Sequence, residues 1–103
     1  MFARHVSIHL TPNSLSDYTR IFENEILPLL RKQKGFKDAI ILSSPGSQDV
    51  IAISLWDSKA NAEAYNEHTR SEVMSASARV IDGTKVQTFE TVASTFHKLA
   101  AKA

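Results

Sequence analysis

The sequence predicts an α+β domain whose elements follow the order β-α-β-β-α-β. The first observation is the run Val-Ile-Ala-Ile-Ser-Leu-Trp at 50–56, which is apolar except for Ser54 and therefore reads as a strand buried on both faces. The second is the alternation of segments with strand period and segments with helix period along the chain. Split β-α-β units in this order are typical of the ferredoxin-like topology.

Composition limits the classes of function. The chain has 103 residues, so we expect one domain at 1–94 with a tail at 95–103. A formal net charge of +1 and the absence of a basic stripe argue against nucleic-acid binding. The absence of cysteine excludes disulfides and thiolate metal sites. No apolar run reaches the ~20 residues of a membrane span, so we expect no membrane partner and a cytoplasmic location.

The first half of the chain predicts a strand, a long helix and a hairpin. Residues 3–10 alternate, with Ala3, His5, Ser7 and His9 on one face and Arg4, Val6, Ile8 and Leu10 on the other. Ser14 is the expected N-cap of a helix whose apolar stripe is Leu15, Tyr18, Phe22, Ile26 and Leu29. We expect Pro28 to kink this helix and Gly35 to end it. Strands at 36–43 and 50–56 then flank the turn Ser-Pro-Gly-Ser at 44–47.

The second half predicts two helices and a last strand. Asp57 or Ser58 caps a helix that carries Ala60, Ala64, Tyr65 and His68 on one side. Residues 69–71 are expected to break it, and a further helix is expected over 72–82 with Gly83 as its stop. The last strand is expected over 84–94, and the segment 95–103 is expected to form a short helix.

The double-faced strand at 50–56 predicts a homodimer. In this topology the first and third strands are central antiparallel neighbours, and the two helices cover one face of the sheet. Nothing in the chain is left to cover the other face. Exposing such a face would cost about 25 cal/mol per Å² of apolar area, so a second copy of the chain is the expected cover.

Several segments resemble the antibiotic biosynthesis monooxygenase superfamily. They are the strand end at Trp56 followed by Asp-Ser-Lys and an Ala-rich helix with Tyr65, the run Ile-Leu-Pro-Leu-Leu at 26–30 with Gly-Phe at 35–36, and Val-Gln-Thr-Phe-Glu-Thr-Val at 86–92. The resemblance implies a dimeric α+β barrel. It also implies one of three activities: cofactor-free oxygenation of electron-rich aromatics, haem degradation, or an unassigned role. The haem-degrading members use an Asn, a Trp and a His where this chain has His5, Tyr65 and Ser75 or a residue near it.

The candidate site residues are His5 and Trp56 as catalytic residues, with Tyr65, His68, Ser7 and His9 in substrate binding. Antiparallel pairing is expected to bring His5 near Trp56, and the helix after Trp56 would add Tyr65 and His68. The alternative is that His5 and His68 are ordinary histidines and that Trp56 and Tyr65 are core aromatics. His5 and His9 cannot share a metal, because four residues along a strand span ~13 Å.

Two functions remain open from the sequence. One is a monooxygenase-like enzyme without cofactors that acts on a small aromatic or quinol-type compound, with His5 as base and Trp56 as a pocket wall. The other is a non-catalytic, small-molecule-binding or stress-associated dimer that uses the same cavity. Haem binding is a third and weaker alternative.

Overall fold

The computed structural model describes residues 1–92, and its centre is a four-stranded antiparallel sheet. The spatial order is β2-β3-β1-β4, formed by β1 (Phe2–Leu10), β2 (Phe36–Ser43), β3 (Asp49–Trp56) and β4 (Ile81–Glu90). The prediction that the first and third strands are central neighbours is therefore confirmed. The tail helix expected at 95–103 lies outside the described residues. No helix in the described part of the chain is long and apolar enough to cross a membrane.

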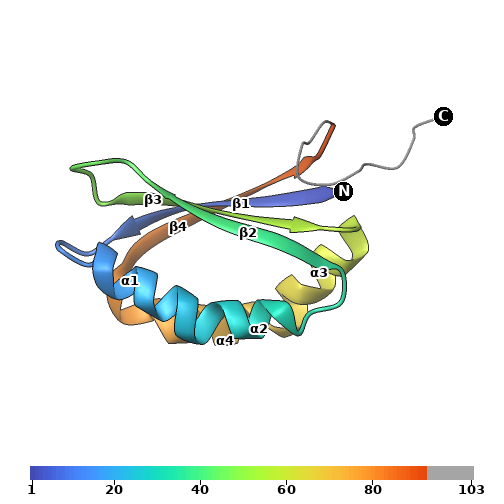
Figure 1. Ribbon diagram of the computed structural model, residues 1–103, viewed down its shortest axis with the longest axis horizontal. Helices are drawn as coiled ribbons and strands as arrows, with labels where there is room; N and C mark the ends of the chain where they lie inside the picture. The colour runs from blue at the N-terminus through green and yellow to red at the C-terminus, as the bar shows by residue number, and fades with distance from the viewer. Residues whose placement is uncertain (93–103) are drawn as a thin grey trace.

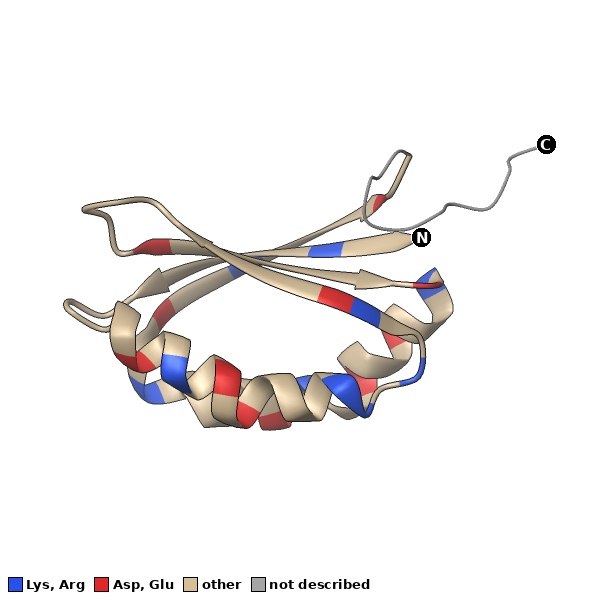
Figure 2. Cartoon of the chain, viewed as in Figure 1, with Lys and Arg blue, Asp and Glu red and all other residues tan. Residues whose placement is uncertain are grey.

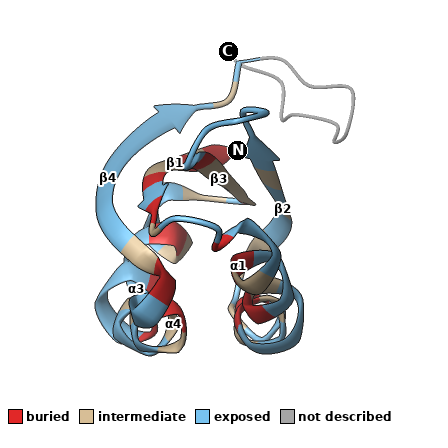
Figure 3. Ribbon diagram, turned by 90° about the vertical axis from the view of Figure 1, so that its left-hand side faces the viewer, coloured by how far each residue is buried: buried red, intermediate tan, exposed pale blue. Residues whose placement is uncertain are grey.

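All the helices lie on one face of this sheet (Figure 1). The first group is α1 (Leu15–Ile21), the π-helix η1 (Phe22–Ile26) and α2 (Leu27–Arg31). The second group is α3 (Lys59–His68), α4 (Arg70–Ser77) and the 3-10 turn η2 (Ala78–Val80). Seen from the end of the sheet, the two groups form separate columns beneath it (Figure 3). Acidic and basic residues are interspersed along these helices (Figure 2).

The first helical segment differs from the expected continuous α-helix. Five residues form a π-helix, in which the N–H of Leu27 donates to the carbonyl of Phe22, five residues back. Pro28 follows in the first turn of α2 and offers no N–H to the preceding turn. The buried residues are Tyr18, Ile21, Ile26 and Leu30, so Leu15 and Leu29 were wrongly placed on the core stripe. The wider π turn explains the shift at Leu29, because it changes the phase of every later residue, whereas Leu15 precedes it at the exposed start of α1.

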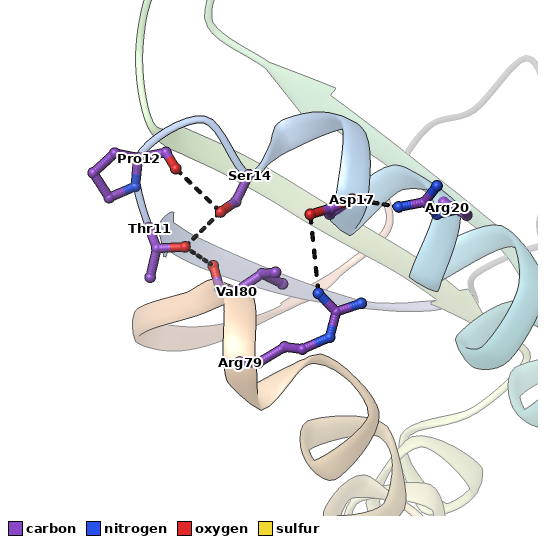
Figure 4. A network of polar contacts seen from close by, with 7 residues as sticks. All are labelled: Thr11, Pro12, Ser14, Asp17, Arg20, Arg79 and Val80. Atoms are coloured by element: carbon purple, nitrogen blue, oxygen red, sulfur yellow. Dashed lines mark hydrogen bonds and ion pairs between the residues drawn. The ribbon is translucent and has the colours of Figure 1, made fainter.

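Ser14 and the turn before it are anchored to the end of the second helical group. The Ser14 side chain does not cap the helix. Its Oγ lies 2.5 Å from the hydroxyl of Thr11, and the backbone N–H of Thr11 donates to the carbonyl of Val80 at 2.9 Å. Asp17 forms ion pairs with both Arg20 and Arg79 (Figure 4). These contacts tie the start of α1 to η2 across a large separation in sequence.

In the second half of the chain, the first helix begins at an expected residue, and the elements after it differ from the prediction. Ser58, one of the two expected caps, is the N-cap of α3, and its Oγ accepts a hydrogen bond from the N–H of Asn61. The buried face of α3 is Ala62 and Tyr65, so the placement of Ala60 and Ala64 on that face was wrong. The break expected at 69–71 occurs at Thr69. The next helix ends at Ser77, and Gly83 lies inside β4 rather than after a helix.

Gly35 joins the two helical groups at the start of β2. Its φ is +80°, a conformation that favours glycine. A Cβ placed there would lie 2.2 Å from the Asp57 side chain and 2.5 Å from that of Asn61. The carbonyl of Gly35 accepts a hydrogen bond from the N–H of Asp57 at 2.8 Å. Gly35 is therefore required for the close approach of this turn to the start of α3.

The register of β1 and β3 decides which side chains face the helices. Phe2 lies opposite Trp56, Arg4 opposite Ser54, and His5 opposite Ile53. Because directly opposed residues share a face and neighbours alternate, Arg4 and Trp56 face the helices while His5 points to the outer face.

The outer face of the sheet carries exposed apolar side chains, and no described element covers it. On β2, Ile40 is 46% exposed and Leu42 45%, and their neighbours Ile53 and Ile51 on β3 are half-buried. On β4, at the other edge of the sheet, Phe89 is 51% exposed. The double-faced character expected of residues 50–56 is thus present in the folded chain. Adjacent exposed residues of this size are uncommon on a surface that stays in water.

Trp56 closes the core at the end of β3, and we expect its truncation to destabilise the fold. Its exposed fraction is 0%, its ring packs 5.6 Å from Phe36 and 5.0 Å from Tyr65, and its Nε1 donates to the Ser54 hydroxyl at 2.9 Å. Trp56→Ala should lower the free energy of unfolding by about 3–5 kcal/mol in urea melts. Leu15→Ala, at a residue 41% exposed, is the control and should change it by less than about 1 kcal/mol. An unchanged denaturant midpoint for Trp56→Ala would contradict this packing.

Candidate functional site

A cavity of about 70 Å³ lies between the sheet and the two helical groups. Its walls are mostly apolar, and they come from both layers: Val6, Ile8, Phe22, Ile26, Leu30 and Val73 among others. Its polar lining residues are two tyrosines, two arginines and three hydroxyl residues: Tyr18, Tyr65, Arg4, Arg70, Ser54, Ser77 and Thr84. Such a mixture of apolar walls and a few converging polar groups is typical of small-molecule sites.

Arg4 is the unusual residue of this cavity. It is 6% exposed, and a guanidinium is seldom buried without a carboxylate partner. Its Nη2 donates to the side-chain oxygen of Asn66 at 3.2 Å, and its Cζ lies 5.1 Å from the centre of the Tyr65 ring. None of the ion pairs between described residues includes Arg4. The chain therefore holds a buried positive charge that the amide of Asn66 and the side chain of Tyr65 stabilise in place of a carboxylate.

The pKa values of Arg4 and of the two tyrosines are shifted mainly by their burial in the cavity wall. Burial lowers the pKa of Arg4, the nearby Tyr65 opposes that change, and the positive charge of Arg70 adds to it. Burial raises the pKa of Tyr65, although Arg4 works against that rise. Burial also raises the pKa of Tyr18 to about 12, with a smaller contribution from Tyr65. Both tyrosines are therefore neutral hydrogen-bonding groups at neutral pH.

Trp56 supports the cavity without lining it. Its ring packs on Tyr65 and its Nε1 holds the hydroxyl of Ser54, and both of these residues line the cavity. Trp56 and Tyr65 are thus brought together as expected, but Trp56 acts behind the wall. Trp56 positions the ring of Tyr65, and that ring in turn contacts the guanidinium of Arg4.

The expected convergence of His5 with Trp56 is wrong. His5, Ser7 and His9 occupy alternate positions of β1 that point to the outer face. The His5 ring makes an edge contact with Phe89 at 6.1 Å, and His9 Nδ1 lies 2.7 Å from Asp49 Oδ1. The physical reason is parity, since Phe2 rather than His5 is the residue opposite Trp56.

His68 also lies away from the cavity. Its side chain is 76% exposed and its Nε2 lies 3.9 Å from Glu67 Oε2. The expectation that Tyr65 and His68 share one side was too coarse, because only Tyr65 is on the buried face of α3. Among the described residues no group of three or more His, Cys, Asp or Glu could hold a metal ion.

A second cavity of about 150 Å³ adjoins the first. It lies between β1, β4 and α3, and Arg4 and Val86 line both cavities. Asn66, which binds the guanidinium of Arg4, belongs to its wall. The Arg4 side chain therefore separates the two cavities, and its conformation determines the volume of each.

Arg4 and Arg70 were missed as functional residues, although the sequence carries a signal for the first. Arg4 begins a strand face whose other members are Val6, Ile8 and Leu10, so a charge was already visible on a face that the apolar pattern buries. Arg70 follows the expected helix break and has no comparable pattern around it. Only the packing of α4 beside η1 and α1 in the folded chain shows that Arg70 reaches the same cavity.

Arg4 should destabilise the free protein, because a buried charge without a counter-charge costs free energy. Replacing it by the apolar residue Met, of similar length, should raise the free energy of unfolding by on the order of 1 kcal/mol. Arg31→Met, an exposed arginine at the end of α2, is the matched control and should not raise it. Thermal or urea unfolding checks this, and a marked loss of stability in Arg4→Met would show that Arg4 is a structural residue.

Comparisons with known proteins place this geometry in a known fold. No protein-family model matches the chain, and no curated protein matches its sequence. The solved structures that resemble it include SnoaB, a cofactor-independent oxygenase from Streptomyces nogalater, with TM-score 0.76 and 10% identity over 91% of this chain and 95% of that one. MhuD with two manganese protoporphyrin IX molecules per active site has TM-score 0.76 and 16% identity over 92% and 98%.

A Nitrosomonas europaea protein provisionally named as an antibiotic biosynthesis monooxygenase has TM-score 0.73 and 12% identity over 90% of this chain and 100% of its own. Structural similarity at such low sequence identity shows a shared fold and does not show a shared function. The chain therefore has the ferredoxin-like α+β fold of the antibiotic biosynthesis monooxygenases, as its sequence segments suggested.

Proposed function

We propose that this protein is a cofactor-independent oxygenase that acts on a small phenol or quinol-type compound in the cavity between sheet and helices. The observation that carries the proposal is the buried guanidinium of Arg4, which stands in an apolar cavity without a carboxylate partner. The fold shared with SnoaB agrees with this chemistry but does not specify a substrate.

Arg4 would stabilise the negatively charged phenolate form of the substrate. A phenol is a poor donor of electrons to dioxygen, whereas its phenolate is a good one. A fixed positive charge in a water-poor cavity stabilises the phenolate and lowers the pKa of the bound phenol. Tyr65 holds the guanidinium in place from below, and the hydroxyl of Ser54 is available to orient the ring oxygen.

The overall reaction balances without another reductant. A phenol with a free para carbon loses its O–H proton and its para C–H hydrogen and gains one oxygen atom at that carbon. The second atom of dioxygen leaves as water with the two hydrogens. The products are a quinone and one water, and all four electrons that reduce dioxygen come from the substrate.

Binding without turnover is the second candidate function. Among residues 1–92 the cavity is lined by no His, Asp or Glu, so no ordinary general base from this part of the chain faces the substrate. An oxygenase would have to release the phenolic proton to solvent. A protein that only binds a small aromatic compound would have no such requirement.

A porphyrin does not fit this cavity. Its volume of about 70 Å³ is far below the roughly 300–1,000 Å³ of pockets that hold drug-sized ligands. No histidine lines it either, and His5, the residue at the expected haem-site position on the first strand, points to the outer face. A cavity that holds benzene has about 150 Å³, so a ligand of one aromatic ring would also have to use part of the adjoining cavity of about 150 Å³, which shares Arg4 and Val86 with the first.

We also propose that two copies of the chain pair through the outer face of the sheet. The exposed side chains of Ile40, Leu42 and Phe89 lie on this face, and burying them would remove apolar area from water. Nδ1 of His5 on the same face is buried without a hydrogen-bond partner, a further sign that the face is incomplete in a single chain.

Oxygen uptake tests the proposed chemistry. With a panel of single-ring phenols and hydroquinones, the parent protein should consume oxygen above the protein-free rate. Arg4→Met should slow uptake by about 10²-fold, the usual effect of losing one group that stabilises an oxyanion. His5→Ala should match the parent, because His5 faces away from the cavity.

Equal rates for the parent and Arg4→Met would contradict the role of Arg4. Saturable binding of a phenol with no uptake above the protein-free rate would leave binding as the function. A strong loss in His5→Ala alone would return the site to the outer face.

Light scattering at low micromolar concentration tests the dimer, and should give about twice the chain mass of 11.4 kDa. Leu42→Lys places a charge on the outer face and should give monomers, whereas Leu15→Lys, at a similarly exposed leucine on α1, should not. A parent protein that is monomeric under these conditions would remove this proposal.

A further inference from the structure

The cavity contains a second cation, Arg70, whose charge the described residues also leave uncompensated. Arg70 is the first residue of α4, it is half-buried, and it lines the same cavity as Arg4. Its positive charge is close enough to contribute to the lowered pKa of Arg4. No ion pair between described residues includes Arg70.

This arrangement contrasts with the arginines on the surface. Arg20 and Arg79 both pair with Asp17, and Lys59 pairs with Glu63 (Figure 4 shows the first group). Those cations are exposed, where a partner contributes little to stability. The two arginines of the cavity are the ones for which a carboxylate would matter, and no acidic residue lines the cavity with them.

Two like charges beside one small cavity repel each other, and an anion between or beside them would relieve the repulsion. A guanidinium has a planar fork of N–H donors that matches the two oxygens of a carboxylate. The remaining walls are apolar, which excludes a small hydrated anion as the natural occupant and favours an anionic group attached to a ring.

We propose that the ligand of this cavity is a single-ring aromatic carboxylic acid, with Arg70 as the residue that selects its carboxylate. This inference rests on the proposed function in using the same cavity: Arg4 faces the phenolic oxygen, and Arg70 supplies the charge for a second acidic group. The substrate class then narrows from phenols to hydroxyaromatic acids. Arg70 is a specificity-determining residue here, and the oxidation itself does not require it.

The test compares 3-hydroxybenzoate, whose carbon para to the hydroxyl is free for the proposed oxidation, with 3-hydroxybenzamide, which has nearly the same shape and no charge. Binding is measured under nitrogen, so that oxidation cannot contribute, by titration calorimetry and by the fluorescence of Trp56, the single Trp of the chain, which packs on Tyr65. At pH 7 the parent should bind the acid at least about tenfold more tightly than the amide, as one charged hydrogen bond provides.

Arg70→Gln should reduce the acid-to-amide ratio to within about threefold, chiefly by weakening the binding of the acid. Arg70→Lys should restore part of the ratio, because it restores the charge without the fork. Arg31→Gln removes one exposed positive charge that does not line the cavity and should keep the parent ratio. An unfolding curve for each variant confirms that it is folded.

Equal affinity of the parent for acid and amide would overturn the proposal, and so would an unchanged ratio in folded Arg70→Gln or an acid that does not bind at millimolar concentration. The proposed function fails separately. If the acid preference depends on Arg70 but no phenol causes oxygen uptake, the carboxylate site remains and the oxygenase does not.

Discussion

The alternation of side chains along β1 is the constraint on which both faces of this protein depend. Arg4 and His5 are neighbours in sequence, yet one enters the cavity and the other points to the outer face. The pairing of Phe2 with Trp56 sets this parity, and a shift of one residue would exchange the two sets completely. The core contacts of Phe2, Ile8 and Leu10 hold the register, because each would leave the core after such a shift.

The buried Arg4 lowers the stability of the folded chain, and the proposed binding of an anion explains why the chain has an arginine there. Apolar side chains occupy the neighbouring positions on the same face of β1, so packing alone would favour an apolar residue at position 4. The chain instead keeps a charge there and supports it with Asn66 and with the Tyr65 ring, which Trp56 holds in turn. Stabilising contacts of this kind reduce the cost of a charge without neutralising it. The anion that we propose as ligand would supply the missing counter-charge.

The fold followed from patterns that are local in sequence, and the site did not. Strand period, turn residues and helix stops were enough for the β-α-β-β-α-β order and for the central pair of strands. The position of His5 could not be derived in that way, because either face of β1 was compatible with its alternation until the register with β3 was known. The burial of Tyr65 without His68 likewise depends on the rotation of α3 against the sheet, which a stripe with few large apolar residues does not determine.

The π-helix before Pro28 gives a physical account of the other wall of the cavity. Tyr18, Phe22, Ile26 and Leu30 all line it and are spaced four residues apart. On an α-helix of 3.6 residues per turn, each step of four overshoots a full turn by about 40°, so three steps would rotate Leu30 about 120° away from Tyr18. The π turn, with its hydrogen bond from Leu27 back to Phe22, is wider and cancels much of this drift. Insertions of this kind are frequent at functional sites. Here the π turn keeps a continuous apolar wall opposite Arg4, so that water has few polar partners around the charge and a bound anion interacts with it strongly.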